Sequence, residues 1–531
     1  MRGTAQGRWM FWTCFVSLVA TSFGFISRAF LLGDWGEAFN LSETQLGEIF
    51  GAGLWPFAIS IVVISLFIDK MGYRNALWFA FGCHVVSGGM TIMAGGYSSL
   101  YWAAFVGALG NGAVEAAINP AVATVYQKEK TKWLNILHAG WPAGLAIAGL
   151  LTIMIGDGAM IGGLIDTIGW EVWQFKVALV FIPIIPYGIM LLRCEFPVNE
   201  RVSAGVSYKE MLREPGGLGI FIVAVLVICE LGRVFSGMAG VDTPWALLIG
   251  LSVAVAAVYG VSVKSLGRPM YVGLLLIMLL LGTTELGTDG WIKELMDPAM
   301  ELIGLDGGWI LVYTATIMTI LRFMAGPIMR TTKLGPLGLL AASSLMVIVG
   351  IITLSRIQTQ AGFIILVAST IYGAGQCFFW PTTLGLVAER FPRGGALTLN
   401  AIAGVGMLGV GILGGPWLGY VQNSTIEKEL LSEAPGIHEV VAGDAQESFF
   451  GSYRAIDNDR VAAHSEALDS EDARAAFSGQ LDGIRTVAKR DALFKVAILP
   501  GIMLVYYLAL IGYFKRQGGY KPEQLEDTAA A

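Results

Sequence analysis

The chain has 531 residues, of which 55% are hydrophobic and only 14% are charged, whereas soluble domains carry about 25% charged residues. These proportions exclude a soluble enzyme, a nucleic-acid-binding protein and a disordered chain. Continuous apolar runs of about 20 residues recur along the sequence and predict membrane-spanning helices, because transmembrane strands would alternate over about ten residues. The net charge of the whole chain is −6. Residues 421–491 alone carry a net charge of −7, with seven Lys/Arg against fourteen Asp/Glu, so the rest of the chain has a net charge of +1.

Fourteen apolar runs follow one another along the chain. They occupy residues 9–32, 43–68, 76–94, 100–126, 133–155, 172–192, 217–235, 244–263, 271–291, 308–329, 335–354, 362–388, 397–420 and 492–514. Arg2 and Arg8 precede the first run, which is longer than a signal-peptide core, so we interpret it as the first span. The sequence therefore predicts an all-α membrane protein with about 14 transmembrane helices.

The loops between these runs alternate in charge. One set is basic, with Lys70, Arg74, Lys128, Lys130, Lys132, Arg193, Arg201, Lys209, Arg213, Lys264, Arg268, Arg330, Lys333, Arg390, Arg393, Lys515 and Arg516. The other set is mostly acidic, with Asp34, Glu37, Asp157, Asp166, Glu171, Asp242, Asp297 and Asp306. Because basic loops stay in the cytoplasm, we expect a multi-pass protein of the inner or plasma membrane with both termini cytoplasmic.

The polar segment 421–491 then faces outward. It is rich in Ala, Ser, Asp and Glu, and it fits either a small helical cap or a loop. With about 70 residues and few large apolar side chains, it would struggle to fold alone. Its simplest interpretation is a spacer without chemistry.

Neither a catalytic site nor a cofactor motif is evident. The five cysteines, Cys14, Cys83, Cys194, Cys229 and Cys377, show no disulfide framework and no metal-ligand spacing. The sequence has no Walker-type phosphate loop and no nucleophile–base constellation. We therefore expect no enzyme activity, no metal and no cofactor.

Two stretches of the first half have counterparts in the second. Ser65 to Arg74 is echoed by Gly326 to Gly335: each has a small residue, a charge four positions later, and then glycine and basic residues. Glu115 with Pro120 is echoed by Gln376 with Pro381, each after a Gly-x-Gly. Repeated halves are typical of secondary transporters.

The motif Asp69-Lys70-x-Gly72-x-Arg74 resembles the loop between the second and third spans of the major facilitator superfamily. The resemblance covers twelve of the fourteen runs and implies two six-helix bundles with two inserted helices. It divides the chain into 1–193 (first bundle), 194–267 (linker with the inserted pair), 268–420 (five helices of the second bundle), 421–491 (acidic insert), 492–515 (last span) and 516–531 (cytoplasmic tail).

A narrower resemblance is to the fucose-permease-like sugar transporters. It is carried by Glu115-Ala-Ala-Ile-Asn119-Pro120, by the stretch from Thr131 to Gly140, and by Trp380-Pro381-Thr followed by Glu389-Arg390-Phe391-Pro392. These relatives move neutral sugars with protons, and the resemblance implies that Glu115 is the proton-linked acid. Arg28 and Ala29 occupy the region where the family has a span-one carboxylate.

Glu115 and Asn119 lie four residues apart, so they share one helix face. Gly107, Gly110 and Gly112 precede them and permit close helix contact. Because desolvation disfavours a charged carboxylate, Glu115 is a candidate proton carrier. A structural hydrogen bond to a neighbouring helix is the alternative.

Asn135, His138 and Trp141 follow at three-residue steps in the next span. The imidazole could hydrogen-bond a sugar hydroxyl or relay a proton to Glu115, and Trp141 offers a face for sugar stacking. Gln376 and Trp380 are the candidates in the second half, because an amide with aromatic side chains suits a hydroxyl-bearing ligand. Packing between spans is the alternative for each of these residues.

Arg28 lies inside the first span, where a charge costs about 2.5–3.5 kcal/mol. It could pair with Glu48, Glu115 or Glu285, or it could bind an anionic substrate. Glu285, with Asp289 four residues later, is a candidate cavity-lining acid.

Six further residues are candidates for a cytoplasmic gate between the halves: Asp69, Lys70, Gly72, Arg74, Arg322 and Arg330. Glu230 and Arg233 of the inserted pair are expected to neutralise one another.

The sequence thus favours a monomeric secondary transporter in the lipid bilayer that binds no nucleic acid. Its expected mechanism is proton-coupled symport of a neutral sugar or polyol by alternating access, with Na⁺ left open as the coupling ion. One alternative is an organic-anion or organophosphate exchanger that uses Arg28. The other is a transporter-like sensor or assembly partner, suggested by the insert and the extra helix pair.

Overall fold

The computed structural model describes residues 5–156, 158, 167–241, 243–288, 308–356, 362–448 and 450–525. Eleven helices in these ranges are long and apolar enough to cross a membrane, and the pair Trp309–Phe323 and Ala325–Thr332, bent by 63°, adds a twelfth span if it counts as one. The expected number of fourteen is therefore not confirmed. Asp289 and the loop acids Asp157, Asp166, Asp242, Asp297 and Asp306 lie outside the described residues.

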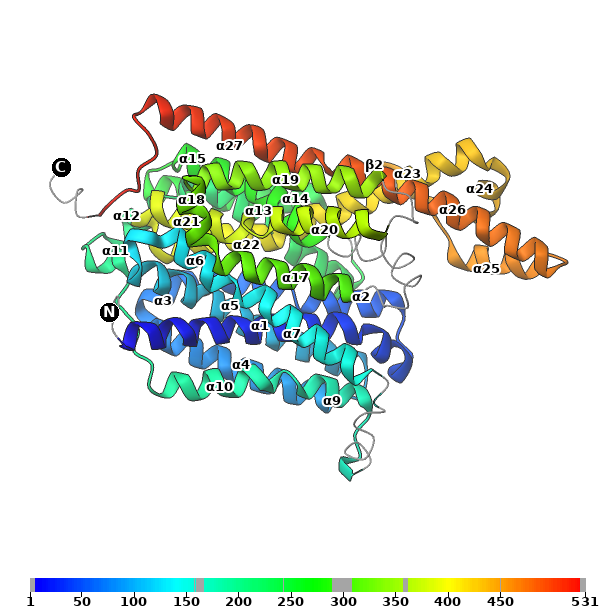
Figure 1. The fold of residues 1–531 in the computed structure, drawn as a ribbon, viewed down its shortest axis with the longest axis horizontal. Coiled ribbons are helices and arrows are strands. Elements are labelled where there is room, and N and C mark those ends of the chain that lie inside the picture. Colours follow the sequence, from blue (N-terminus) through cyan, green and yellow to red (C-terminus); the bar gives the residue numbers. More distant parts are fainter. Residues whose placement is uncertain are drawn as a thin grey trace.

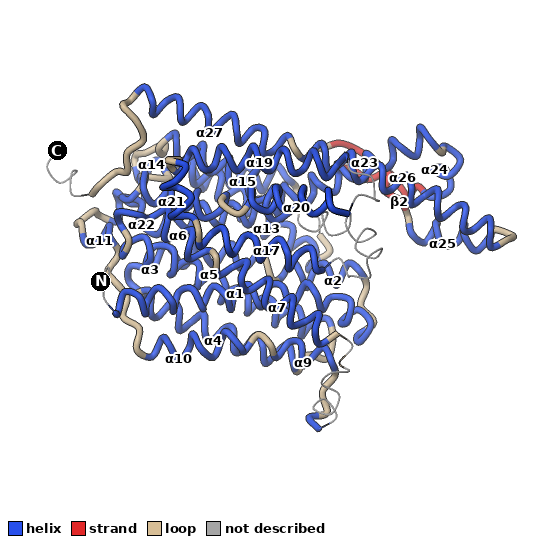
Figure 2. Tube along the Cα trace, in the orientation of Figure 1, coloured by secondary structure: helices blue, strands red, loops and turns tan. Residues whose placement is uncertain are grey.

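Helices make up nearly all of the molecule, as expected for an all-α membrane protein (Figure 2). They run side by side in an elongated bundle, and the two chain ends lie at one end of it, here called the termini end (Figure 1).

Within the described residues, the first half of the bundle contains ten elements. They are α1 (Ala5–Phe39), α2 (Glu43–Ala52), α3 (Trp55–Met71), α4 (Tyr73–Ile92), α5 (Tyr97–Val125), the 3₁₀ turn η1 (Gln127–Glu129), α6 (Lys130–His138), α7 (Gly140–Ile155), α9 (Val172–Ala178) and α10 (Phe181–Leu192). A capping box between Ser42 and Gln45 starts α2. Gly72 separates α3 from α4 with a φ of +79°, a conformation that favours glycine.

The second half contains the corresponding elements. They are α15 (Pro269–Gly282), the π-helix η3 (Thr283–Gly287), α17 (Gly308–Phe323), α18 (Ala325–Thr332), α19 (Pro336–Arg356), α20 (Gly362–Gln376), α21 (Phe379–Arg390), the 3₁₀ turn η4 (Pro392–Gly394), α22 (Gly395–Gly409), the π-helix η5 (Val410–Gly414), α23 (Gly415–Glu433) and α27 (Ile498–Arg516). The halves meet where α7 packs on α17, α3 on α22, and α6 on α21.

Short helices and a helix pair connect the two halves. They are α11 (Glu200–Ser203), α12 (Tyr208–Arg213), α13 (Gly216–Ala239) and α14 (Trp245–Val263). α13 and α14 pack on each other, and α13 also packs on α15 and α22. The ion pair expected inside this pair is present, since Arg233 Nη2 lies 2.6 Å from Glu230 Oε1.

Residues 421–491 are helical with one β-hairpin, and they project from the bundle opposite the termini end (Figure 1). The segment continues α23 into α24 (Pro435–Val441), the antiparallel strands β1 (Ala442–Ser448) and β2 (Gly451–Ile456), α25 (Asn458–Ala467) and α26 (Glu471–Val496). Ile426, Leu430, Phe477 and Leu481 belong to its own apolar core. Because α23 and α26 adjoin bundle helices, this small core does not have to fold alone.

We expect Gly112→Ala to destabilise the first half, because α3 and α5 touch at this glycine. A Cβ atom there would lie 1.7 Å from Ser60 Oγ and 2.5 Å from the Phe57 carbonyl oxygen. Overpacking of this kind costs about 1–3 kcal/mol, so the melting temperature of the purified protein should fall. Gly82→Ala is the matched control, since a Cβ at that exposed position meets no atom within 4 Å. Equal melting temperatures for the two variants would contradict this contact.

Candidate functional site

Glu115, Asn119 and His138 form a continuous buried hydrogen-bonded chain. Asn119 Nδ2 donates to Glu115 Oε2 at 2.6 Å, and Asn119 Oδ1 lies 2.9 Å from His138 Nε2. Since the amide nitrogen serves the carboxylate, the amide oxygen is left to accept from the imidazole. All three side chains are at least 95% buried. The one-turn spacing predicted for Glu115 and Asn119 therefore produces a direct contact, to which α6 adds the histidine.

Glu285 and Arg322 form an ion pair in the second half. Arg322 Nη2 lies 3.0 Å from Glu285 Oε1, and the arginine is 1% exposed. Glu285 belongs to the π-helix η3, an irregularity that often marks functional positions. Arg322 was expected one to two turns above Arg330, in a cytoplasmic gate between the halves. It lies instead on the wall of a cavity between the halves, the central cavity described below, whereas Arg330 is exposed.

Arg322 also donates to two backbone carbonyls. Its Nε bonds the Cys377 oxygen at 2.6 Å, and its Nη1 bonds the His138 oxygen at 2.8 Å. Each of these carbonyls lies four residues before a proline, Pro381 or Pro142. Because proline has no N–H to complete the helical bond, both carbonyls are left to accept the guanidinium. One belongs to each half, so Arg322 joins the halves through their proline breaks.

Pro120 has the same effect in α5. The carbonyl four residues before it belongs to Ala116, and it accepts a hydrogen bond of 2.9 Å from Asn400 Nδ2 of α22. Asn400 also donates to Ser65 Oγ at 2.9 Å. The prolines of the internal repeat, Pro120 and Pro381, therefore each supply an acceptor for a polar side chain of the second half.

A cavity between the halves is lined by both buried polar groups. Its residues are Phe57, Ile61, Glu115, His138, Trp141, Glu285, Leu286, Arg322, Trp380 and Met407. It measures about 30 Å³, which is space for one or two water molecules. A larger solute therefore requires the halves to separate.

Three other predicted binding residues, Asn119, Asn135 and Gln376, are buried but do not belong to this lining. Asn119 contacts the lining residue Glu115 through its amide nitrogen. Asn135 Nδ2 donates to Thr382 Oγ1 of α21 at 3.2 Å, in the contact between the halves. Gln376 Nε2 lies 3.7 Å from Met318 Sδ within the second half. Phe57, Ile61 and Met407 were not predicted from the sequence, because apolar lining residues cannot be distinguished from core residues by their pattern.

Arg28 lies outside the central cavity. It lines a different cavity within the first half. Of the two alternatives for Arg28, the ion pair with Glu48, Glu115 or Glu285 is not found, and among the described residues no acid pairs with Arg28. This placement removes Arg28 from the candidate substrate cavity.

At the termini end, the halves are joined by a network that the sequence did not predict. Lys130 of α6 donates to Glu200 at 2.6 Å and to the Ala388 carbonyl of the second half at 3.1 Å. The Thr131 hydroxyl donates to Glu389 Oε1 at 2.5 Å. These contacts close the bundle at this end.

Four of the predicted gate residues lie at the same end. Asp69 pairs with Arg201, and Arg74 Nη2 donates to the Leu192 carbonyl at 3.1 Å. Gly72 forms the turn between α3 and α4, and Lys70 is exposed. Asp69 and Arg74 thus fix the first half and the linker, and neither bridges the halves directly.

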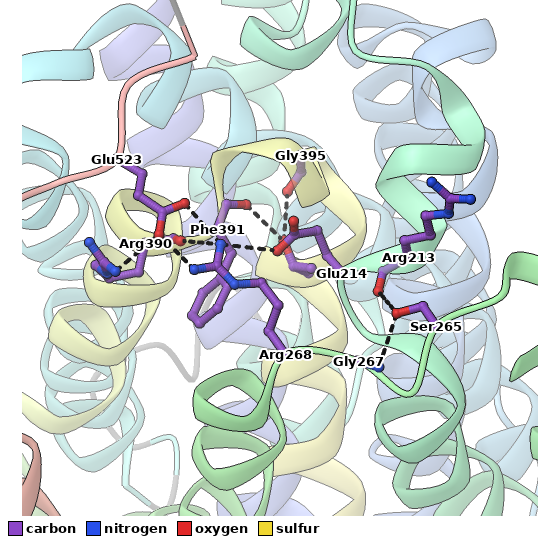
Figure 3. Close-up of polar contacts among 10 residues, drawn as sticks. Arg213, Glu214, Ser265, Gly267, Arg268, Arg390, Phe391, Gly395 and Glu523 are labelled. Carbon is purple, nitrogen blue, oxygen red and sulfur yellow. Dashed lines mark hydrogen bonds and ion pairs between the residues drawn. The ribbon is translucent and has the colours of Figure 1, made fainter. Parts of the chain in front are cut away.

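The C-terminal segment after α27 folds back over this network. Arg268 and Arg390 both point to the carboxylate of Glu523, at 2.6 and 3.0 Å (Figure 3). Tyr520 donates to Glu389 Oε2 at 2.8 Å, so the two oxygens of Glu389 bind the tail and Thr131 of the first half. The tail is therefore part of the closed end of the bundle.

Comparisons with known proteins agree with this architecture. The family model of the Major Facilitator Superfamily matches residues 11–416, whereas no curated protein matches the chain in sequence. The structure of the proton:xylose symporter XylE bound to 6-bromo-6-deoxy-D-glucose is 14% identical, covers 95% of this chain and 96% of that chain, and has a TM-score of 0.60.

Two further structures are similar to this chain. The E. coli fucose:proton symporter FucP is 12% identical over 93% of this chain and 97% of that chain, with a TM-score of 0.53. A bacterial homolog of the human lysosomal transporter Spinster is 13% identical over 97% of this chain and 98% of that chain, with a TM-score of 0.58. At such identities the likeness shows the fold alone.

We expect Glu285→Gln to lower the free energy of unfolding by about 3–5 kcal/mol, because it leaves the buried charge of Arg322 without its partner. The double variant Glu285→Gln/Arg322→Gln should cost less than the sum of the two single changes. Thermal unfolding of the four proteins measures this coupling. Glu230→Gln is the control, since its partner Arg233 is 61% exposed. Additive effects of the two substitutions would contradict the pair.

Glu523→Gln should loosen the termini end, because the carboxylate of Glu523 binds two arginines. The readout is maleimide modification of Ser65→Cys, at a 1% exposed position, in a chain whose five native cysteines are replaced. We expect modification to be about fivefold faster, because the loss of about 1 kcal/mol of stabilisation makes opening of this end about fivefold more frequent. Glu195→Gln changes an exposed acid at the same end and should have no effect. An unchanged rate in Glu523→Gln would show that the tail does not hold this end closed.

Proposed function

The chain belongs to the major facilitator superfamily, whose members are membrane transporters, and from this premise we propose that it moves a small polar solute by alternating access. We further propose that the solute is a neutral sugar or polyol and that it moves together with a proton. Two of the similar structures are those of proton-coupled sugar symporters.

The chain of Glu115, Asn119 and His138 is the observation that carries proton coupling. It gives a buried carboxylate a strong hydrogen-bond donor within a cavity that the two halves share. Protonation of Glu115 removes the charge that Asn119 Nδ2 stabilises, so it weakens this bond. It thereby frees Asn119 and His138 to bind a hydroxyl-bearing solute.

The charges of the cavity favour a neutral solute. With Glu115 protonated and His138 neutral, Glu285 and Arg322 are the remaining charged groups among the described residues of the lining, and their charges cancel. Trp141 and Trp380 provide aromatic faces for a sugar ring, one from each half. An anion exchanger built on Arg28 gains no support here, because the lining lacks that residue.

Alternating access would open the termini end by separating the halves. This movement breaks the contacts of Lys130, Thr131 and Asn400 with the opposite half, together with the bond from Arg322 to the His138 carbonyl. We assign the termini end to the cytoplasm of the cell membrane, because the basic loop residues Lys70 and Arg74 lie there. The projecting insert then faces outward, where a sensor or assembly role for it remains an alternative.

We expect Glu115→Gln to abolish uphill uptake while leaving downhill exchange, since exchange requires no net proton movement. The assay is uptake of radiolabelled xylose and fucose into proteoliposomes, with an acidic outside and an inside-negative membrane potential of about 100 mV. One proton per solute supports about 50-fold accumulation from this potential alone, to which the pH gradient adds, and the variant should reach about onefold.

Glu230→Gln is the matched control, because Glu230 is also a buried glutamate but lies in the inserted pair. It should accumulate the sugar as the unmodified protein does. Uphill, pH-dependent uptake by Glu115→Gln would exclude Glu115 as the proton carrier. The absence of sugar uptake by the unmodified protein would exclude these two sugars as its substrates.

A further inference from the structure

A second cavity lies inside the first half, where α1, α4, α5, α9 and α10 meet. It measures about 60 Å³ and shares no lining residue with the central cavity. Its polar lining residues are Ser27, Arg28, His84, Ser87, Thr91 and Asn111, and no aspartate or glutamate of the described part of the chain lines it. It therefore differs from the central cavity, where an acid neutralises the arginine.

The charge of Arg28 has no counterion in the described part of the chain. The side chain is 93% buried, and Nη1 has neither solvent contact nor a hydrogen-bond partner. Ser27 Oγ is also buried and unpaired. An isolated charge at such a depth is costly, so the site requires a negative partner.

The backbone around Arg28 is shaped for the guanidinium. A Cβ at Gly53, between α2 and α3, would lie 1.8 Å from Nη1, and one at Gly107 of α5 would lie 3.9 Å from Nη2. The arginine thus fills space that only glycine leaves at residue 53. The packing of the backbone therefore fixes the guanidinium group in one position beside the cavity.

His84 orients the side-chain amide of Asn111, another hydrogen-bond donor of the cavity. Its Nδ1 lies 2.9 Å from the Tyr187 hydroxyl, and its Nε2 lies 2.9 Å from Asn111 Oδ1. Because the amide oxygen of Asn111 is engaged, its amide nitrogen is left to donate. Arg28, Ser27 and Asn111 therefore bring hydrogen-bond donors and one positive charge to the cavity.

We propose that this cavity binds a small monovalent anion, chloride or a carboxylate as small as formate. The guanidinium supplies the charge and charge-assisted hydrogen bonds. By volume the cavity holds about four water molecules, which suits such an anion and excludes a sugar. Asn111 lies one helical turn from Glu115 on α5, so the anion binds beside the helix that carries the proton site, in a place that the transported solute does not enter.

The test is thermal unfolding of the full-length purified protein at constant ionic strength, with gluconate exchanged for chloride or, separately, for formate. We expect a saturable rise in melting temperature of about 2 °C or more with at least one of the two anions. Arg28→Gln should remove this rise. Arg8→Gln is the matched control, since it makes the same change at an exposed position of the same helix.

Gly53→Ala gives a second, charge-conserving variant, because its methyl group displaces the guanidinium. Binding of radioactive chloride or formate at equilibrium should approach one ion per unmodified chain and fall at least tenfold in Gly53→Ala. Two results would each overturn the proposal: no response of the unmodified protein to either anion, or an equal response in Arg28→Gln and Arg8→Gln.

Discussion

A backbone carbonyl that loses its helical partner inside a membrane must find another donor, and this constraint organises the contact between the two halves. Pro120, Pro142 and Pro381 each remove one helical N–H, which frees the carbonyls of Ala116, His138 and Cys377. Asn400 satisfies the first, and Arg322 satisfies the other two. Two of the polar bonds across the interface, from Asn400 to Ala116 and from Arg322 to His138, therefore occur where the sequence interrupts its own helices.

The same constraint limits where charges can lie. Arg322 is tolerated in the middle of the bundle because Glu285 and two carbonyls surround it. Each of these partners is directional, so a displacement of one half relative to the other changes how well the guanidinium is satisfied. Arg28 contrasts with it, since the described residues around it provide hydrogen-bond donors and no acid.

The sequence predicted those features that depend on local periodicity and lacked those that depend on packing between distant segments. Glu115 and Asn119 meet because of helical spacing, and His138 was a candidate because it lies inside the next span, at three-residue steps from Asn135 and Trp141. The depth of Arg322 was misjudged because α17 and α18 bend by 63° next to it, so distance along the chain from Arg330 does not give distance along the bundle.

Other features had no signal at all in the sequence. Phe57 and Met407 line the cavity with the same residue types that fill the core. The contact of Glu523 with Arg268 joins residues 255 positions apart, and no pattern of charge along the chain marks two such residues as partners. The sequence contains the three prolines, but it does not indicate that Asn400 and Arg322 lie opposite the carbonyl groups that these prolines free.

The junction of α26 with α27 has a mechanical consequence. The two helices form one continuous element of 46 residues, Glu471–Arg516, which belongs to the bundle at one end and to the projecting segment at the other. The 26 residues of α26 extend about 39 Å at 1.5 Å per residue. A rotation of the last span by about 10° would therefore swing the tip by roughly 7 Å. Small rotations of the bundle therefore become larger displacements at the tip of the projecting segment, which an attached fluorophore could follow.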